Sequence, residues 1–339
     1  MIEAGALGDA SDTPVQTRAG QAVVRVLAPP RTSSPTFVYD RGRYTTFDLP
    51  DGRIAEGAGI DDRGRIVVGA KTDDRDSCDY RGYLRDPGGR YTRVDVPGAA
   101  VTNPLKISDR GEIAGNFRTD ASCTSPLNGF LRDRRGRFVR IRFPGSAYTQ
   151  AAGVNDRGQV VGEYGTGDGA SHGFVWQDGR YRTADVPGAA ATSLLDVNDS
   201  GATVGVYVEA DGSVHAFVRG AAGRVTVVDR PGAVLTLPFG INNRGQIAGF
   251  SGASLQDVQQ GDVSGFVLRQ GADGPFTPVE VPGATGTGPF DINDLGVVVG
   301  QYANPDVGVS STSAGPGPAS PGSPYRPMPA LPRSVPPRA

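Results

Sequence analysis

Three charged residues occupy the same position in alternate copies of a repeated segment. Lys106, Asp196 and Asp291 each stand directly before the hydrophobic end of this segment, where the other three copies have Gly59, Gly153 and Gly240. If the segment forms the innermost strand of a ring, these side chains approach a shared central channel. Charged groups gathered in a concave site often mark function, and a pair of carboxylates suits a calcium ion. A buried ion pair or a solvated channel lining is the interpretation that we favour.

An acidic stretch, KTDDRDSCD, offers a second and weaker candidate for calcium. Its carboxylates belong to Asp73, Asp74, Asp76 and Asp79. Calcium takes six to eight oxygen ligands, so a run of aspartates in one loop could supply several. A solvated acidic loop without a metal is the favoured interpretation.

The two histidines, His172 and His215, fall at the same position in successive repeats. A catalytic histidine would more naturally break a repeat than follow it, so we expect both imidazoles to bond a neighbouring strand or loop. The chain contains no G-x-S-x-G, H-E-x-x-H, P-loop or G-x-G-x-x-G motif. No residue is therefore assigned a catalytic role.

The two cysteines, Cys78 and Cys123, lie in equivalent loops of adjacent repeats. Equivalent loops emerge on one face, so a disulfide between them is geometrically conceivable, although the required Cα separation of about 4.4–6.8 Å is demanding. The bridged and the free states both stay open. A bridge would indicate an oxidising compartment.

The elements that must position these residues are built around one hairpin that occurs six times. The copy GVNDRGQVVG begins at Gly153, and a turn of the form Asn155-Asp156-Arg157-Gly158 joins its two short strands. Asn and Asp bond their own backbone at such turns, and glycine enters positive φ without strain. The six turn glycines are Gly64, Gly111, Gly158, Gly201, Gly245 and Gly296, with periods of 47, 47, 43, 44 and 51 residues.

Each period contains four strand patterns. An aromatic strand such as Gly129-Phe130-Leu131 is followed by a strand that runs to a Pro-Gly step, and then by the two strands of the hairpin. Four strands in about 45 residues correspond to one blade of a β-propeller. The fold predicted for residues 36–303 is therefore all-β, a six-bladed β-propeller, in preference to a solenoid or a pair of sandwiches.

The phase of the repeats predicts how the ring closes. The chain enters with the aromatic strand and its partner, Phe37–Leu49, and leaves with the hairpin strands, Thr287–Tyr302. Together these halves would form one composite blade from the N- and C-terminal strands. Closure leaves no open sheet edge.

The flanking segments differ from the repeats. Residues 1–35 begin with polar and small residues and contain one apolar patch, Ala22–Ala28, which could form an extra strand or part of a lead-in; for most of the segment we expect a loosely ordered arm. Residues 304–339 are rich in proline and serine with few aliphatic residues, which predicts a disordered tail in preference to an SH3-type ligand.

Composition narrows the partners. The formal net charge is −2 and the repeats contain no basic block, so nucleic acid is not expected. No apolar run approaches the about 18 residues of a membrane span, and no signal peptide is visible at the start. We expect a monomer whose ligand is an unidentified small molecule, glycan or protein, bound on a rim of variable loops (70–81, 116–128 and 251–264).

The repeats resemble those of the extracellular HAF-repeat proteins, which carry a His-Ala-Phe step and a G-I-N-x-x-G-x-V-V-G hairpin. His215-Ala216-Phe217 reproduces the step, whereas Arg81, Asn128 and Ser264 replace the histidine in other repeats. The resemblance implies a propeller-like fold and an extracellular location, with a cytoplasmic location as the alternative, and it implies no activity. A non-enzymatic binding or structural module without a cofactor is thus expected. A propeller enzyme of the lactonase or glycan-active type, with a carboxylate and calcium site in the channel, is the alternative.

Overall fold

The computed structural model describes residues 36–303 except 48, 50–52, 72–78, 122–123 and 270–273. Several sequence predictions lie outside the described residues: the N-terminal arm, the C-terminal tail, the calcium candidates Asp73, Asp74 and Asp76, and the cysteines Cys78 and Cys123.

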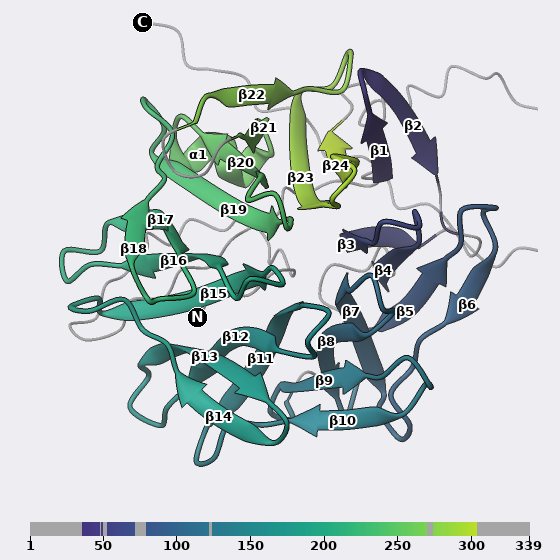
Figure 1. The fold of residues 1–339 in the computed structure, drawn as a ribbon, viewed down its shortest axis with the longest axis vertical. Coiled ribbons are helices and arrows are strands. Elements are labelled where there is room, and N and C mark those ends of the chain that lie inside the picture. Colours follow the sequence, from purple (N-terminus) through teal and green to yellow (C-terminus); the bar gives the residue numbers. More distant parts are fainter. Residues whose placement is uncertain are drawn as a thin grey trace, which may run out of the picture. The chain divides into compact units, whose positions relative to one another are not determined.

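The described chain forms six four-stranded antiparallel sheets arranged as blades around a central axis (Figure 1). This confirms the six-bladed β-propeller. The innermost strands of the blades are the first strands of the repeated hairpin, and neighbouring innermost strands contact one another around the axis. They are β3 (Ile54–Ile60), β7 (Val101–Ile107), β11 (Tyr148–Val154), β15 (Ala191–Val197), β19 (Leu235–Ile241) and β23 (Gly286–Ile292).

The second strand of each blade is the other half of the hairpin, and the third is the aromatic strand. The second strands are β4 (Ile66–Lys71), β8 (Ile113–Arg118), β12 (Val160–Gly165), β16 (Thr203–Val208), β20 (Ile247–Gly252) and β24 (Val298–Ala303). The third strands are β1 (Thr36–Asp40), β5 (Tyr80–Arg85), β9 (Asn128–Arg132), β13 (Ser171–Gln177), β17 (Val214–Arg219) and β21 (Ser264–Leu268).

The outer strands are shorter than the sequence predicts. They end three or more residues before each Pro-Gly step, because that step forms a turn of its own; Gly98, for example, has φ of 77°. They are β2 (Arg43–Phe47), β6 (Tyr91–Arg93), β10 (Phe138–Ile141), β14 (Arg180–Thr183), β18 (Val225–Val227) and β22 (Phe276–Val279).

The ring closes through the composite blade that the repeat phase predicts. Its strand order is β2-β1-β24-β23, and β1 pairs antiparallel with β24, with Phe37 opposite Gly300. Two strands from the start of the described chain thus pair with two from its end. The composite blade therefore has four antiparallel strands like the other five, and β24 is paired on both of its edges at the seam.

The core lies between neighbouring blades. Five phenylalanines of the third strands, among them Phe130 and Phe174, are at most 1% exposed. Glycines of the second strands make room for this packing: a Cβ on Gly162 would lie 1.9 Å from the carbonyl oxygen of Gln150 and 3.1 Å from the Phe174 ring. Burial of these large rings supplies the main favourable term for association of the blades.

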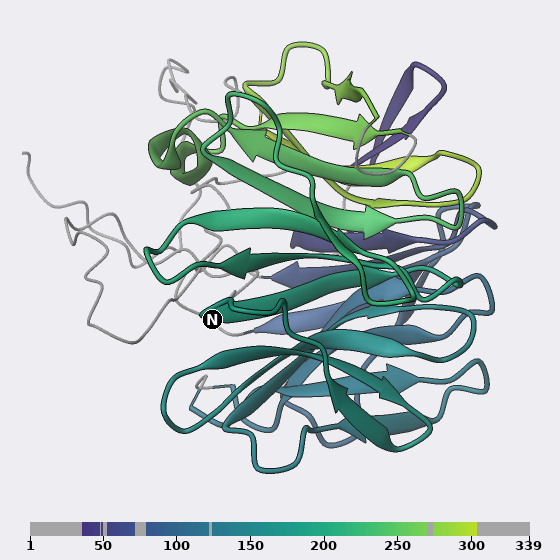
Figure 2. The same ribbon diagram turned by 60° about the vertical axis from the view of Figure 1, so that its left-hand side comes forward.

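Two faces of the ring differ in their connections (Figure 2). We call the turn face the one that carries the tight turns between innermost and second strands and between third and outer strands. The opposite loop face carries the Pro-Gly connections and the variable loops. One of these loops contains a short helix, α1 (Leu255–Gln260), which the sequence analysis does not predict; Ser254 caps its start and Gly261 ends it with φ of 78°.

Candidate functional site

The three charged residues singled out from the sequence meet on the propeller axis. The ammonium of Lys106 lies 2.6 Å from Oδ1 of Asp291 and 3.3 Å from Oδ2 of Asp196. It also donates to the carbonyl oxygen of Phe290 at 3.0 Å, so all three of its N–H donors are used. The three residues are between 4% and 6% exposed. We call this group the axial triad.

Backbone groups of the following blades complete the axial triad. Oδ2 of Asp291 accepts from the Ile60 amide at 2.8 Å, and Oδ2 of Asp196 accepts from the Ile241 amide at 2.9 Å. Each carboxylate therefore ties its own blade to the next one. Charge-assisted bonds of this kind satisfy buried carboxylates that would otherwise be expensive to desolvate.

The alternation of charge and glycine has a steric cause. A Cβ on Gly153 would lie 2.7 Å from Cα of Asp196, and one on Gly240 would lie 2.7 Å from Oδ1 of Asp291. A Cβ on Gly59 would lie 2.8 Å from Cα of Lys106. The axis therefore has room for one side chain per pair of blades.

Burial sets the protonation of the axial triad. It raises the pKa of Asp196 to about 6, with Asp291 adding to the rise and Lys106 opposing it. Burial alone would lower the pKa of Lys106, but the carboxylates of Asp196 and Asp291 outweigh it and hold the pKa above the usual value. The ammonium is thus charged at neutral pH and fills the space between the two carboxylates.

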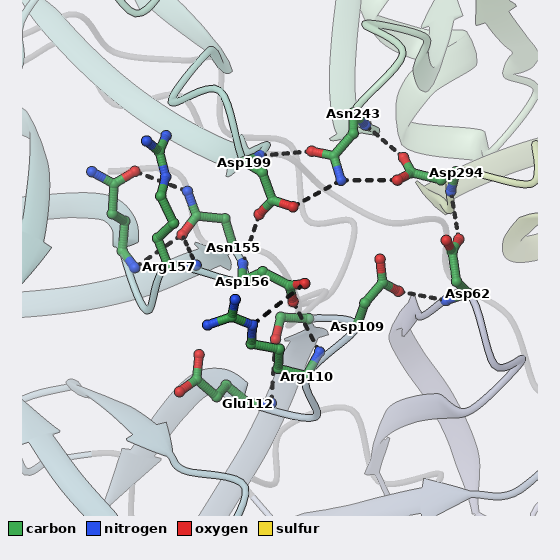
Figure 3. A network of polar contacts seen from close by, with 12 residues as sticks. Asp62, Asp109, Arg110, Glu112, Asn155, Asp156, Arg157, Asp199, Asn243 and Asp294 are labelled. Carbon is green, nitrogen blue, oxygen red and sulfur yellow. Dashed lines mark hydrogen bonds and ion pairs between the residues drawn. The ribbon is translucent and has the colours of Figure 1, made fainter.

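A second set of side chains surrounds the axis at the turn face. Its members are the residues that follow the first turn position in each hairpin: Asp62, Asp109, Asp156, Asp199, Asn243 and Asp294. We call them the carboxylate ring (Figure 3). Oδ1 of each member accepts a backbone N–H from the preceding blade at 2.6–2.9 Å. The side-chain amide of Asn243 also donates to Asp199 and Asp294.

A belt of amides stands between the axial triad and the carboxylate ring. Nδ2 of Asn155 donates to the carbonyl oxygen of Asn198 in the next blade at 2.9 Å, and Asn198, Asn242 and Asn293 continue the same pattern. The same asparagines accept backbone N–H groups within their own turns. One residue type therefore both shapes the turn and fastens the blade to its neighbour.

The carboxylate ring opens into a cavity of about 60 Å³ whose floor is the axial triad. Burial, followed by the neighbouring carboxylates of Asp62, Asp156 and Asp294, raises the pKa of Asp109 to about 6. Burial also raises the pKa of Asp62; the backbone N–H of Asp294 opposes the rise and the Asp294 carboxylate adds to it. The like charges of these carboxylates therefore repel one another at this mouth of the channel.

Three members of the carboxylate ring are close enough to share a cation. Asp62, Asp109 and Asp294 each present one carboxylate oxygen within 4.8 Å of the others. A donor set made only of carboxylate oxygens suits a hard cation such as calcium. The repeated turn pattern predicts only a turn role for these aspartates. Their recurrence at one position in five of the six repeats, with Asn243 in the other, is the signal that could have identified the ring.

The two histidines have structural partners, as the repeat position predicts. Nδ1 of His172 lies 2.8 Å from Asp185, and Nδ1 of His215 lies 2.7 Å from Asp229. Each aspartate also accepts the backbone N–H that follows its histidine. The pairs fasten the third strand to the segment after the outer strand. Asp79, the described member of the acidic stretch, accepts hydrogen bonds from Arg53 and Arg81.

The similarity of this chain to known proteins lies in its propeller fold. No family model and no curated sequence matches the chain. A TolB-like protein from Agrobacterium tumefaciens superimposes with a TM-score of 0.57 at 12% identity, over 79% of this chain and 98% of that one. TolB from Acinetobacter baumannii gives 0.56 at 15% identity, over 75% of this chain and 63% of that one. A gluconolactonase from Xanthomonas campestris gives 0.39 at 13% identity, over 62% of this chain and 72% of that one, and supports no argument about activity.

The two TolB similarities show a shared propeller fold and nothing finer. Among the described residues, no helix has the length and apolar character that a membrane crossing requires.

Proposed function

We propose that the protein is a non-enzymatic binding module whose axis is closed by an internal ion pair. One observation carries this proposal: the Lys106 ammonium stands between Asp196 and Asp291, at 3.3 and 2.6 Å. A propeller enzyme with calcium bound at the axial triad would need those carboxylate oxygens for its metal. Here the ammonium and two backbone amides use them. The rigid ring then serves as a scaffold for ligands bound at its surface.

The alternative, a lactonase or glycan-active enzyme with calcium in the channel, makes a different prediction about the same residues. Thermal melting of the full-length protein in increasing calcium distinguishes them. For a binding module, any calcium-dependent rise in Tm persists in Asp196→Asn, because the axial triad holds no metal. A rise in Tm that Asp196→Asn abolishes and that Asp109→Asn leaves intact would place calcium at the axial triad and contradict the proposal.

Export is a further part of the proposed function and rests on the resemblance to HAF-repeat proteins. It predicts that Cys78 and Cys123 are bridged in protein recovered from its native compartment. Mass spectrometry of peptides prepared without reduction checks this. Free thiols together with a cytoplasmic location in cell fractionation would contradict export.

A further inference from the structure

A second cavity, of about 180 Å³, lies between the last complete blade and the composite blade that closes the ring. It opens between turns of the turn face. The complete blade contributes Arg244 and Arg269, and the composite blade contributes Arg41 and Leu295. The cavity is thus separate from the axis, and anything bound in it would contact both blades at the seam.

The charge of this cavity is one-sided. Three arginines line it, and none of its described lining residues carries a carboxylate. Among the described residues, these arginines make one ion pair, a loose contact between Nε of Arg41 and Oδ1 of Asp40 at 3.7 Å. On the same face Arg65 has a close carboxylate partner in Asp61, at 2.6 Å, whereas Arg110 lies 3.9 Å from Asp156. No described carboxylate lies closer to the three guanidinium groups of the cavity, and such a group of cations favours an anion.

The rest of the lining is apolar. Val267, Val279 and Ile292 belong to the buried cluster that joins the two blades, and they line one side of the cavity. Leu295 lies at its edge with 54% of its surface exposed. A cavity of about 150 Å³ can hold a benzene-sized body, so this one has room for a compact apolar group attached to the anion.

Three of the lining residues break the repeat. Leu295 stands at a turn position that holds Arg63, Arg110, Arg157, Ser200 or Arg244 in the other blades. Arg269 begins its turn where two other blades use Asp86 and Asp133, whose carboxylates accept the backbone N–H groups of their own turns. Both departures replace a residue that suits the turn by one that suits the cavity.

The third lining residue that breaks the repeat, Arg41, has a strained backbone conformation. Arg41 has φ of 47°, in the left-handed region, in a two-residue hairpin turn before Gly42. The equivalent turn of another blade places Asp178 there, at φ of 50°. Asp and Asn tolerate this region far better than a long side chain does. Strain held at one residue beside a cavity is typical of a functional position.

We propose that this cavity binds a small organic carboxylate. The guanidinium groups of Arg244 and Arg269 hold the carboxylate, Arg41 reaches over the mouth, and the apolar body of the ligand packs on Val267, Ile292 and Leu295. A ligand held in this way connects the composite blade to its neighbour and stabilises the closed ring.

The test uses the full-length protein and benzoate as the probe, with calorimetric titration and thermal melting as readouts. Benzoate is expected to raise Tm by a few degrees at about ten times its Kd. Benzyl alcohol, acetate and inorganic phosphate are the comparison probes, and each is expected to bind at least about tenfold more weakly. Phosphate or acetate binding as tightly as benzoate, or no benzoate binding at millimolar concentrations, would overturn the proposal.

Two variants and one matched control locate the site. Arg244→Gln should weaken benzoate binding about tenfold, whereas Arg157→Gln, at the same turn position outside the cavity, should leave it unchanged. Arg41→Asn should raise the Tm of the free protein by about 2 °C through relief of strain and yet weaken benzoate binding. Equal binding by wild type, Arg244→Gln and Arg41→Asn would exclude this cavity as the site.

Discussion

The axial triad and the carboxylate ring lie on the same axis, yet they treat charge in opposite ways. In the axial triad two carboxylates face one ammonium, and every donor and most acceptors are used. In the carboxylate ring five aspartates and one asparagine accept backbone or amide N–H groups, and a neighbouring guanidinium, that of Arg110, lies 3.9 Å from Asp156. The repeats explain the difference. A residue type that recurs in all six blades brings like charges together, whereas a position that carries a side chain in every second blade can hold both cations and anions.

The comparison teaches that the two groups should affect stability with opposite signs. The axial triad stabilises the ring only while its three members are all present, because removal of one leaves a buried charge without a partner. The carboxylate ring carries repulsion that is relieved by removing one charge. The predictions below follow from this contrast.

The largest effect is expected for Lys106→Met. It leaves Asp196 and Asp291 buried together without a cation, which should lower the free energy of unfolding by about 3–5 kcal/mol. Burial raises the pKa of Asp196 to about 6 even beside Lys106. Loss of the cation favours protonation of this carboxylate further, so the variant should regain stability as the pH falls from 8 to 5. Urea denaturation at pH 5 and pH 8 measures both effects.

The control for that variant replaces the whole axial triad by neutral residues, as Lys106→Met with Asp196→Asn and Asp291→Asn. Neutral packing often restores what breaking a buried ion pair removes. The triple variant should therefore be more stable than Lys106→Met alone. If it is equally unstable at pH 5 and pH 8, loss of the lysine side chain's packing, and not its charge, would be the cause.

A smaller loss is expected when a side chain is added beside the axial triad. Gly153→Ala places a Cβ 2.7 Å from the backbone of Asp196 and should cost about 1–3 kcal/mol, because the neighbouring strand must move. Gly167→Ala is the matched control, since nothing lies within 4 Å of a Cβ at that turn. Equal denaturation midpoints for the two variants would contradict the steric origin of the alternation.

The smallest effect, and the one of opposite sign, is expected in the carboxylate ring. The pKa of Asp109 is raised from 3.8 to about 6, so the folded protein binds a proton more readily than the unfolded chain does. This carboxylate therefore opposes folding above pH 6 and ceases to do so below about pH 4. Asp109→Asn should stabilise the protein by about 1 kcal/mol at pH 8, after allowance for solvent screening, and by nothing at pH 4.

Asp133→Asn serves as the comparison for that variant. Its exposed carboxylate accepts backbone N–H groups of Arg135 and Arg137, which hold its pKa below the usual value. Its replacement should lower stability at pH 8, not raise it. A gain in both variants would point to a general effect of net charge and not to the carboxylate ring.

Much of the architecture could be predicted from the sequence, because each turn and strand pattern occurs six times and the copies support one another. The turn glycine Gly158 and its five counterparts establish the hairpin, and the phase of Phe37 and Tyr302 establishes the composite blade. The innermost strand could be inferred from small residues such as Gly153. The lengths of the outer strands could not, since Val94 and Val96 suit a strand but precede a turn that redirects the backbone.

The sites were less predictable. Lys106, Asp196 and Asp291 stood out because they break a pattern, but their mutual distances depend on the size and closure of the ring. Asp109 and its counterparts followed the pattern and were therefore assigned to turn formation alone. The arginines of the seam cavity come from three different turns, Arg41, Arg244 and Arg269, and only the folded ring brings them to one cavity.

The alternation along the axis also limits how such a ring can grow. A Cβ on Gly59, Gly153 or Gly240 would meet the charged residue of the following blade, so the sterically complete unit is a pair of blades. A ring with an odd number of these repeats would place two side chains, or two glycines, next to each other at one junction. Gain or loss of repeats that keeps this axis intact must therefore add or remove two blades at a time. The single chain is in this sense built from three pairs of blades.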